Sequence, residues 1–359
     1  MDDKRFYPFY EKFSDVIRLP VVGKLLVSVL LAGLFLVPHF CVIRINTSDI
    51  NQVLLRWDWM LGVIIFFAMF TLYYATYTFR NLFLLLDVLW KPHEGHPGYI
   101  TYINQTLSNR TFLTAACVFG FTNLMVGLCF GLPDNITSTW ERISLGWGYF
   151  LAGFVCGLPV GGIYGVIKVI VYLVREGTFE LDYTSPDGCG GVRFLGDAIV
   201  KFSAVTLIVG VLISIYIINA NWEREHDFLV NFLMWAWVAF PYILSLLIVI
   251  VPSVGINQLL RQYKFQKDCE FKGDLKKLLN NMNSLSNGES VQINDLKERH
   301  EHITALRTKL YQMRAWPFGL SENYKYTVIF ISNLIMPVLA LPPVLDAIKG
   351  MLTSIMASF

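Results

Sequence analysis

The chain has 359 residues, of which 55% are apolar and 16% are charged, and its formal net charge is +2. Soluble globular proteins carry about 25% charged residues, so this composition, with a mean hydropathy of +0.51, excludes an ordinary soluble domain. The apolar residues gather in runs close to the ~20 residues with which an α-helix crosses the hydrocarbon core of a membrane. We therefore expect an all-α polytopic membrane protein.

Seven apolar runs are long enough to be transmembrane helices. The first begins near residue 20 without a small-residue cleavage site, so we expect it to stay in the membrane and not to be removed as a signal peptide. The chain then divides into a transmembrane region with spans 1–6 (1–251), a cytosolic helical hairpin (252–320), and span 7 with a C-terminal amphipathic helix (321–359). The predicted spans are Leu25–Ile43, Trp59–Phe79, Thr111–Leu132, Ile143–Val174, Ile199–Ile218, Phe228–Val251 and Lys325–Leu341.

Lysine and arginine residues alternate between the two sides of the predicted membrane. The N-terminal segment, the regions that follow spans 2 and 4, and the segment after span 6 hold 23 of them. The intervening loops and the C-terminal tail hold 5, when Lys325 at the start of span 7 is left out. Positively charged residues accumulate in cytosolic loops. This distribution predicts a multi-pass protein of the cell membrane with its N-terminus in the cytosol and its C-terminus outside.

Predicted span 4 carries a glycine at every fourth position. Because residues four apart share one face of a helix, these glycines form a groove beside Pro159. Two interpretations fit this pattern. Small residues let a neighbouring helix approach closely, or a proline-kinked helix acts as a hinge or lines a pore, where freed carbonyl groups face protein or water. The residues concerned are Gly153, Gly157, Pro159, Gly161 and Gly165.

The loop after span 4 combines a Pro-Asp-Gly turn signal with further glycines. The backbone amides of such a loop can form an anion-binding nest; the alternative is a structural elbow that leads the chain into span 5. It lacks the Gly-Lys-Ser/Thr ending and the preceding strand of a phosphate-binding P-loop. The residues predicted for a ligand or partner contact in this cytosolic loop are Pro186, Asp187, Gly188, Gly190, Gly191 and Arg193.

This run resembles a pattern, Pro-Asp-x-x-Gly-Gly-x-x-x-Leu-Gly, of uncharacterised multispan bacterial membrane proteins. In this chain the pattern extends from Pro186 to Gly196 and covers no more than this short stretch. The resemblance implies a multispan membrane protein and no particular reaction.

Between Asn257 and Ala315 the chain is polar, with apolar residues at steps of mainly three and four. Such steps produce amphipathic helices with an apolar seam, and a turn signal at Ser286-Asn287-Gly288 divides the stretch into two. We expect an antiparallel hairpin that is either a spacer packed on itself or an arm for oligomerisation or docking. The seam residues are Phe271, Leu275, Leu278, Met282 and Leu285, followed by Leu296, Ile303, Leu306, Leu310 and Met313.

The hairpin is expected to be separated from the spans on both sides. Pro252 and Gly255 are predicted to interrupt its connection to span 6, and Trp316-Pro317 its connection to span 7. Eleven basic and eight acidic residues between Pro252 and Tyr324 leave too little net charge for a nucleic-acid surface.

Signatures of enzymes and metal sites are missing from the sequence. The six histidines are scattered and none has the spacing of a zinc-binding helix, so we expect no catalytic residues, no metal and no cofactor. The cores of the spans hold no carboxylate, which weighs against a cation-driven transporter. Asn123, Asn231 and Asn333 are expected to join helices through hydrogen bonds or to line a path.

These features leave two classes of function. The first is an integral membrane sensor/effector or scaffold that forms homo-oligomers through the glycine face and the hairpin and couples the lipid bilayer to a cytosolic protein partner. The alternative is an oligomeric ion channel or pore that the hairpin gates. The long hairpin favours the first class, and neither class involves nucleic acid.

Overall fold

A computed structural model describes residues 8–15, 20–46, 57–93, 98–130, 138–219, 228–284 and 290–316. Within these ranges the chain is almost entirely helical, and six helices are long and apolar enough to cross a membrane. The protein is therefore an all-α multi-pass membrane protein. Predicted span 7 (Lys325–Leu341) and the C-terminal amphipathic helix lie outside the described residues.

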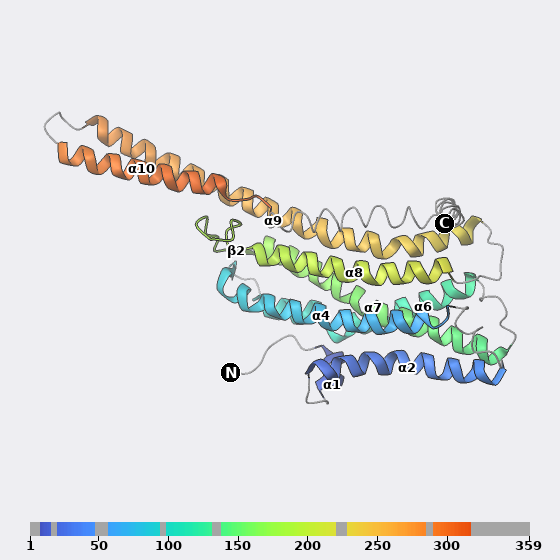
Figure 1. Ribbon diagram of the computed structural model, residues 1–359. Coiled ribbons are helices and arrows are strands. Elements are labelled where there is room, and N and C mark those ends of the chain that lie inside the picture. Colours follow the sequence, from blue (N-terminus) through green and yellow to red (C-terminus); the bar gives the residue numbers. More distant parts are fainter. Residues whose placement is uncertain are drawn as a thin grey trace, which may run out of the picture.

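The long helices lie side by side in a bundle from which α9 and α10 protrude (Figure 1). We call this end of the bundle the arm end and the opposite one the far end. The six spanning helices are α2, α4, α6, α7, α8 and α9, and successive ones run in alternate directions. The described elements are α1 (Phe9–Asp15), α2 (Pro20–Asn46), α4 (Met60–Leu89), β1 (Trp90–Pro92), α5 (Tyr99–Thr106), α6 (Asn109–Phe130), α7 (Thr139–Arg175), β2 (Gly177–Phe179), α8 (Arg193–Asn219), α9 (Phe228–Ser284) and α10 (Ser290–Gln312).

Helix α7 contains predicted span 4 and extends beyond it at both ends. It begins after Ser138, whose side chain accepts a hydrogen bond from the backbone N–H of Trp140 (3.3 Å) and so satisfies one of the free donors of the first turn. Pro159 lies inside the helix, which continues to Arg175. A proline removes one backbone hydrogen bond, and packing against neighbouring helices in a membrane bundle makes that loss tolerable.

The expected interruption between span 6 and the hairpin is wrong. Helix α9 is 57 residues long and passes through Pro241, Pro252 and Gly255 without ending. At a rise of 1.5 Å per residue it is about 86 Å long, far more than the bilayer requires. One helix therefore connects the far end of the bundle to the tip of the protruding part.

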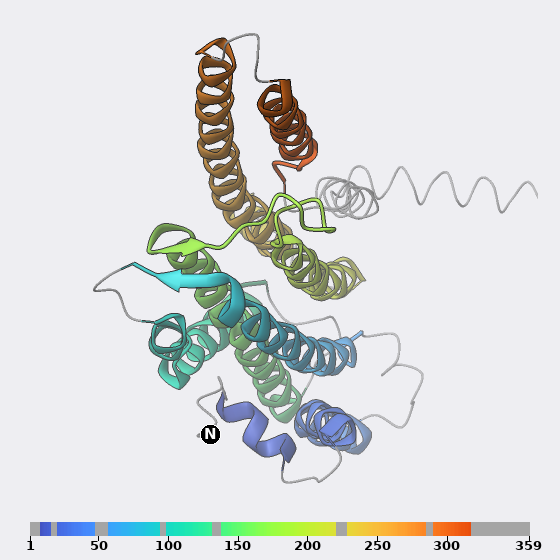
Figure 2. The same ribbon diagram turned by 90° about the vertical axis from the view of Figure 1, so that its left-hand side faces the viewer.

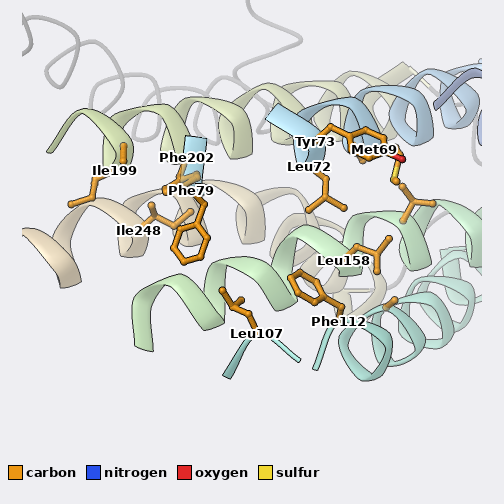
Figure 3. Close-up of a cluster of buried hydrophobic side chains, with 14 of the residues drawn as sticks. Met69, Leu72, Tyr73, Phe79, Leu107, Phe112, Leu158, Ile199, Phe202 and Ile248 are labelled. Atoms are coloured by element: carbon orange, nitrogen blue, oxygen red, sulfur yellow. The ribbon is translucent and has the colours of Figure 1, made fainter. Parts of the chain in front are cut away.

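The core lies between α4, α6, α7, α8 and α9, and side chains from these helices point together (Figure 3). Phe79 of α4 and Phe202 of α8 have ring centroids 6.5 Å apart, and Ile248 of α9 lies beside them. Because lipid is as apolar as these side chains, van der Waals packing holds such helices together, and removal from water contributes little.

The protruding part of α9 and the antiparallel α10 form what we call the arm, residues 257–284 and 290–316 (Figure 2). Asp268 of α9 forms an ion pair with Arg307 of α10 (2.7 Å), and nearer the bundle Lys264 binds the carbonyl oxygen of Met313. Phe271, Leu275 and Leu278 of the predicted seam are less exposed than their neighbours but only half-buried. Among the described seam residues, Leu310 and Met313 are fully buried, and both lie at the base of the arm.

Two short strands at the arm end were not expected from the sequence. β1 and β2 pair antiparallel, with Trp90 opposite Phe179, and so join the end of α4 to the end of α7. The Trp90 Nε1–H donates a hydrogen bond to the carbonyl of Leu173 (2.8 Å). Its ring lies so close to Gly177 that a Cβ atom there would come within 2.2 Å of it.

Candidate functional site

The glycine face of α7 is covered by α6 of the same chain. A Cβ atom at Gly157 would lie 2.7 Å from both the carbonyl oxygen of Ala115 and the Cα of Ala116, so two backbones meet there. This close approach needs residues without side chains. It leaves this face of α7 no room for a second copy of the protein. The other glycines of the face contact α6 or the turn before it in the same manner: Gly153, Gly161 and Gly165.

A chamber of about 110 Å³ lies inside the bundle, between α4, α6, α7, α8 and α9. Gly153 and Pro159, two residues predicted from the sequence, belong to its wall. A second chamber of about 60 Å³ lies toward the arm end and shares Thr71, Pro159 and Thr206 with the first. The two chambers are neighbours along the bundle, and their walls are almost entirely apolar.

Most of the polar side chains of this wall have hydrogen-bond partners within the chain. Thr71 donates to the carbonyl of Ala68 (3.0 Å), and Thr206 donates to that of Phe202 (2.9 Å). The amide of Asn123, in α6, donates to the carbonyl of Tyr149 in α7 (2.6 Å). Asn123 therefore joins two helices, one of the two roles expected for it. The side chain of Asn231 and all of Asn333 lie outside the described part of the chain.

A buried polar cluster at the far end was missed by the sequence analysis. His39 of α2 contacts the hydroxyl of Ser144 in α7 through Nδ1 (2.8 Å) and the carboxylate of Asp58 through Nε2 (3.3 Å). Because a carboxylate only accepts hydrogen bonds, Nε2 donates to Asp58. Both His39 and Asp58 are almost fully buried, and they tie α2 to the start of α4 and to α7. Their separation in the sequence gives no periodic signal that would have revealed them.

A second buried cluster, which the sequence analysis also missed, lies at the arm end. Glu11 of α1 is 1% exposed and forms an ion pair with Arg80 of α4, and Lys24 lies 4.0 Å from its other oxygen. The neighbouring Tyr10 belongs to the wall of the second chamber and shares a hydrogen bond with Thr76 (2.7 Å). α1 thus packs beside α2 at the edge of the bundle and reaches α4 through Tyr10 and Glu11. The sequence signal was the mixture of aromatic and charged residues before the first span.

The predicted loop after span 4 folds around Asp187. Its carboxylate accepts hydrogen bonds from the backbone N–H groups of Cys189 (2.8 Å), Gly191 (3.0 Å) and Arg193 (3.2 Å). Burial raises the pKa of this carboxyl, but the backbone hydrogen bonds outweigh burial and hold the pKa below its usual range. The amides expected to receive an external anion are therefore occupied by the loop's own side chain.

The glycines and the proline of the loop have separate roles in shaping it. Pro186 is exposed and lies in a turn closed by a hydrogen bond from Gly188 N–H to the carbonyl of Ser185 (3.1 Å). Gly188, Gly190 and Gly191 have φ values of 66°, 70° and 90°, a region in which L side chains are strained.

The loop contacts the base of the arm. The carbonyl of Gly188 accepts a hydrogen bond from Arg314 N–H (2.8 Å), and the thiol of Cys189 lies 3.4 Å from the carbonyl oxygen of Trp316. On the other side of this junction the Asn257 amide of α9 donates to the carbonyl of Ala315 (2.6 Å). The loop that leads into α8 is therefore attached to the segment that ends the arm.

Comparisons with protein-family models, with curated protein sequences and with solved structures find no match. Among the described residues, no group of three or more histidine, cysteine, aspartate or glutamate side chains is placed to hold a metal ion.

Proposed function

We propose that the protein is a membrane sensor or effector that passes changes in the packing of its spans to a cytosolic protein partner through the arm. The observation that carries this proposal is the continuity of α9. Trp237, Phe240 and Leu244 form part of the chamber wall, and the same helix continues to Ser284 in the arm. A shift of α9 at the chamber is therefore a shift of the arm.

The attachment of the loop to the arm supports this proposal. Gly188 and Cys189 contact the backbone of residues 314 and 316, and Asn257 holds residue 315 from the other side. The base of the arm is thus fixed to the start of α8 as well as to α9. Movement of these two helices relative to each other would change the direction of the arm.

The distribution of basic residues supports a cytosolic arm, since 23 lysines and arginines are predicted on one side of the membrane and 5 on the other. Because α6 fills the glycine face, the proposed self-association uses the arm instead. The half-exposed seam of the arm provides apolar area for a partner helix, such as a second copy or another protein.

The proposal is tested by measuring whether the arm responds to a change in the chamber. In a chain whose exposed cysteines are replaced by serine, spin labels at Leu279→Cys in the arm and Glu180→Cys beside the loop report the arm's direction as a distance distribution. We expect Phe240→Ala, which alters the chamber wall, to shift this distribution. Insertion of two glycines between Gln262 and Tyr263 of α9 should abolish the shift, because the insertion breaks the rigid connection.

Two controls decide the outcome. Val118→Ala, a change on the outward face of α6, should leave the distribution unchanged. Identical distributions for the unaltered chain and Phe240→Ala would refute transmission through α9.

Stable unitary currents in a planar bilayer that disappear in Gly157→Leu would favour the channel instead, although the apolar chamber walls count against ion passage.

A further inference from the structure

Three aromatic side chains stand between the larger chamber and the outside of the bundle. Phe119 of α6 lies 5.4 Å from Phe240 and 6.1 Å from Trp237 of α9 between ring centroids, and the two α9 rings are 6.2 Å apart. All three belong to the chamber wall and all three are half-exposed. We call this set the aromatic window.

The window lies between two helices, α6 and α9, that touch each other little. α6 packs along the length of α7, and α9 packs along α8, but α6 and α9 touch at few positions. Side chains and not backbones therefore close the chamber at this place. Aromatic side chains can change rotamer without moving a helix, so this is the side on which the chamber opens with the least rearrangement.

The chamber's chemistry selects an apolar occupant. The donor groups of Thr71, Thr206 and Asn123 are already bonded to carbonyl groups of the chain. A polar solute or a hydrated ion would lose its water contacts there without equivalent replacements, which is costly. The volume of about 110 Å³ is comparable to the engineered apolar cavity of ~150 Å³ that binds benzene. It accommodates a short run of methylenes but not a lipid headgroup.

We propose that the chamber binds the end of one acyl chain of a membrane lipid, which passes through the aromatic window between α6 and α9. The bilayer supplies this ligand at the depth of the chamber, and the headgroup stays outside the bundle. Because Trp237 and Phe240 belong to α9, the inserted chain contacts the helix that continues into the arm. The inference deepens the proposed function by naming the ligand, and in that respect it rests on it.

The test uses the full-length protein in vesicles that contain a phosphatidylcholine with a photoreactive diazirine near the end of one acyl chain. After illumination, mass spectrometry maps the labelled residues. We expect labels inside the chamber, for example on Cys156 and Val209, in addition to labels on outward residues. Ala152→Phe fills the chamber and should lower the interior labelling by about tenfold, because overpacking is costly. Val118→Phe, on the outward face of α6, should leave it unchanged.

A second variant keeps the test decisive if Ala152→Phe does not fold. Phe119→Ala removes one member of the window and should raise interior labelling. Labels confined to outward residues in the unaltered chain, or interior labelling that neither variant changes, would overturn the inference. Interior labelling without any response of the arm would leave lipid binding in place and refute the proposed function, so the two failures are distinguishable.

Discussion

A single carboxylate, that of Asp187, organises the loop at the base of the arm. Its pKa lies below the usual range because three backbone N–H groups bind the charged form more strongly than burial disfavours it. A depressed folded-state pKa contributes stability that is present above the unfolded pKa of ~3.9 and is lost as the pH falls through the folded value. The loop should therefore be fully formed at neutral pH and loosen only below about pH 4.

We expect Asp187→Asn to loosen the loop at neutral pH, as acid does in the unaltered chain, because an amide has one acceptor oxygen where the carboxylate has two. The buried thiol of Cys189 reports loosening through its labelling rate with a charged disulfide reagent, in a chain with Cys269→Ser. At neutral pH, where enough thiolate is present to react, the rate should be higher in Asp187→Asn than in the unaltered chain. Asp182→Asn is the matched control, since that exposed carboxylate accepts its hydrogen bonds from the N–H and the hydroxyl of Thr184, away from the amides that bind Asp187. Equal rates in both variants would contradict this role.

A sequence pattern reveals the role of a single residue only when the residues that act with it are adjacent in the chain. The turn at Pro186 and the need for glycine after it could be predicted, because turn chemistry involves adjacent residues. The contact between His39 and Ser144 joins positions 105 residues apart, and a lone histidine near the end of a span gives no hint of its partner. The acceptor for the loop amides was also missed, because the nest was treated as open to an external anion.

At the scale of the elements, the spacing of glycines in α7 determines how closely α6 approaches. We expect Gly157→Ala to destabilise the bundle by about 1–3 kcal/mol, since the added methyl group meets backbone atoms that cannot rotate away. Gly146→Ala in the same helix is the control. Its Cβ atom would lie 3.6 Å from the nearest atom, so it should be neutral or gain up to ~1 kcal/mol of helix propensity. Thermal unfolding in detergent distinguishes them, and equal melting temperatures would contradict the packing argument.

The helices themselves were largely predictable, because the length of an apolar run reflects the thickness of the bilayer. The six predicted spans within the described residues each coincide with a long helix. Interruptions were not predictable in the same way. In a soluble protein a proline such as Pro252 commonly marks the end of a helix. In α9 the neighbouring helices compensate for the missing hydrogen bond, and the helix continues. The pairing of β1 with β2 depends on two segments that are far apart in the chain and too short to have a periodic pattern.

At the scale of the whole molecule, the arm and α1 are at the same end of the bundle (Figure 1). Cys269 is exposed on the arm. We expect it to react with a membrane-impermeant thiol reagent only when the reagent can reach the cytosolic face of the membrane. A cysteine in place of the exposed Arg142, near the far end, should react from outside, in a chain with Cys269→Ser. Both sites labelled from one side of sealed cells would refute the predicted orientation.

The position of α1 has a consequence for biosynthesis. Tyr10 packs on Phe112, and Phe9 N–H binds Asn109, although about a hundred residues separate each pair. At ~5–20 residues per second, translation needs several seconds to supply those partners. Arg80, the partner of Glu11 in α4, is itself synthesised 69 residues after it. Ribosome-bound chains that stop before residue 112 should therefore leave the beginning of the protein open to protease.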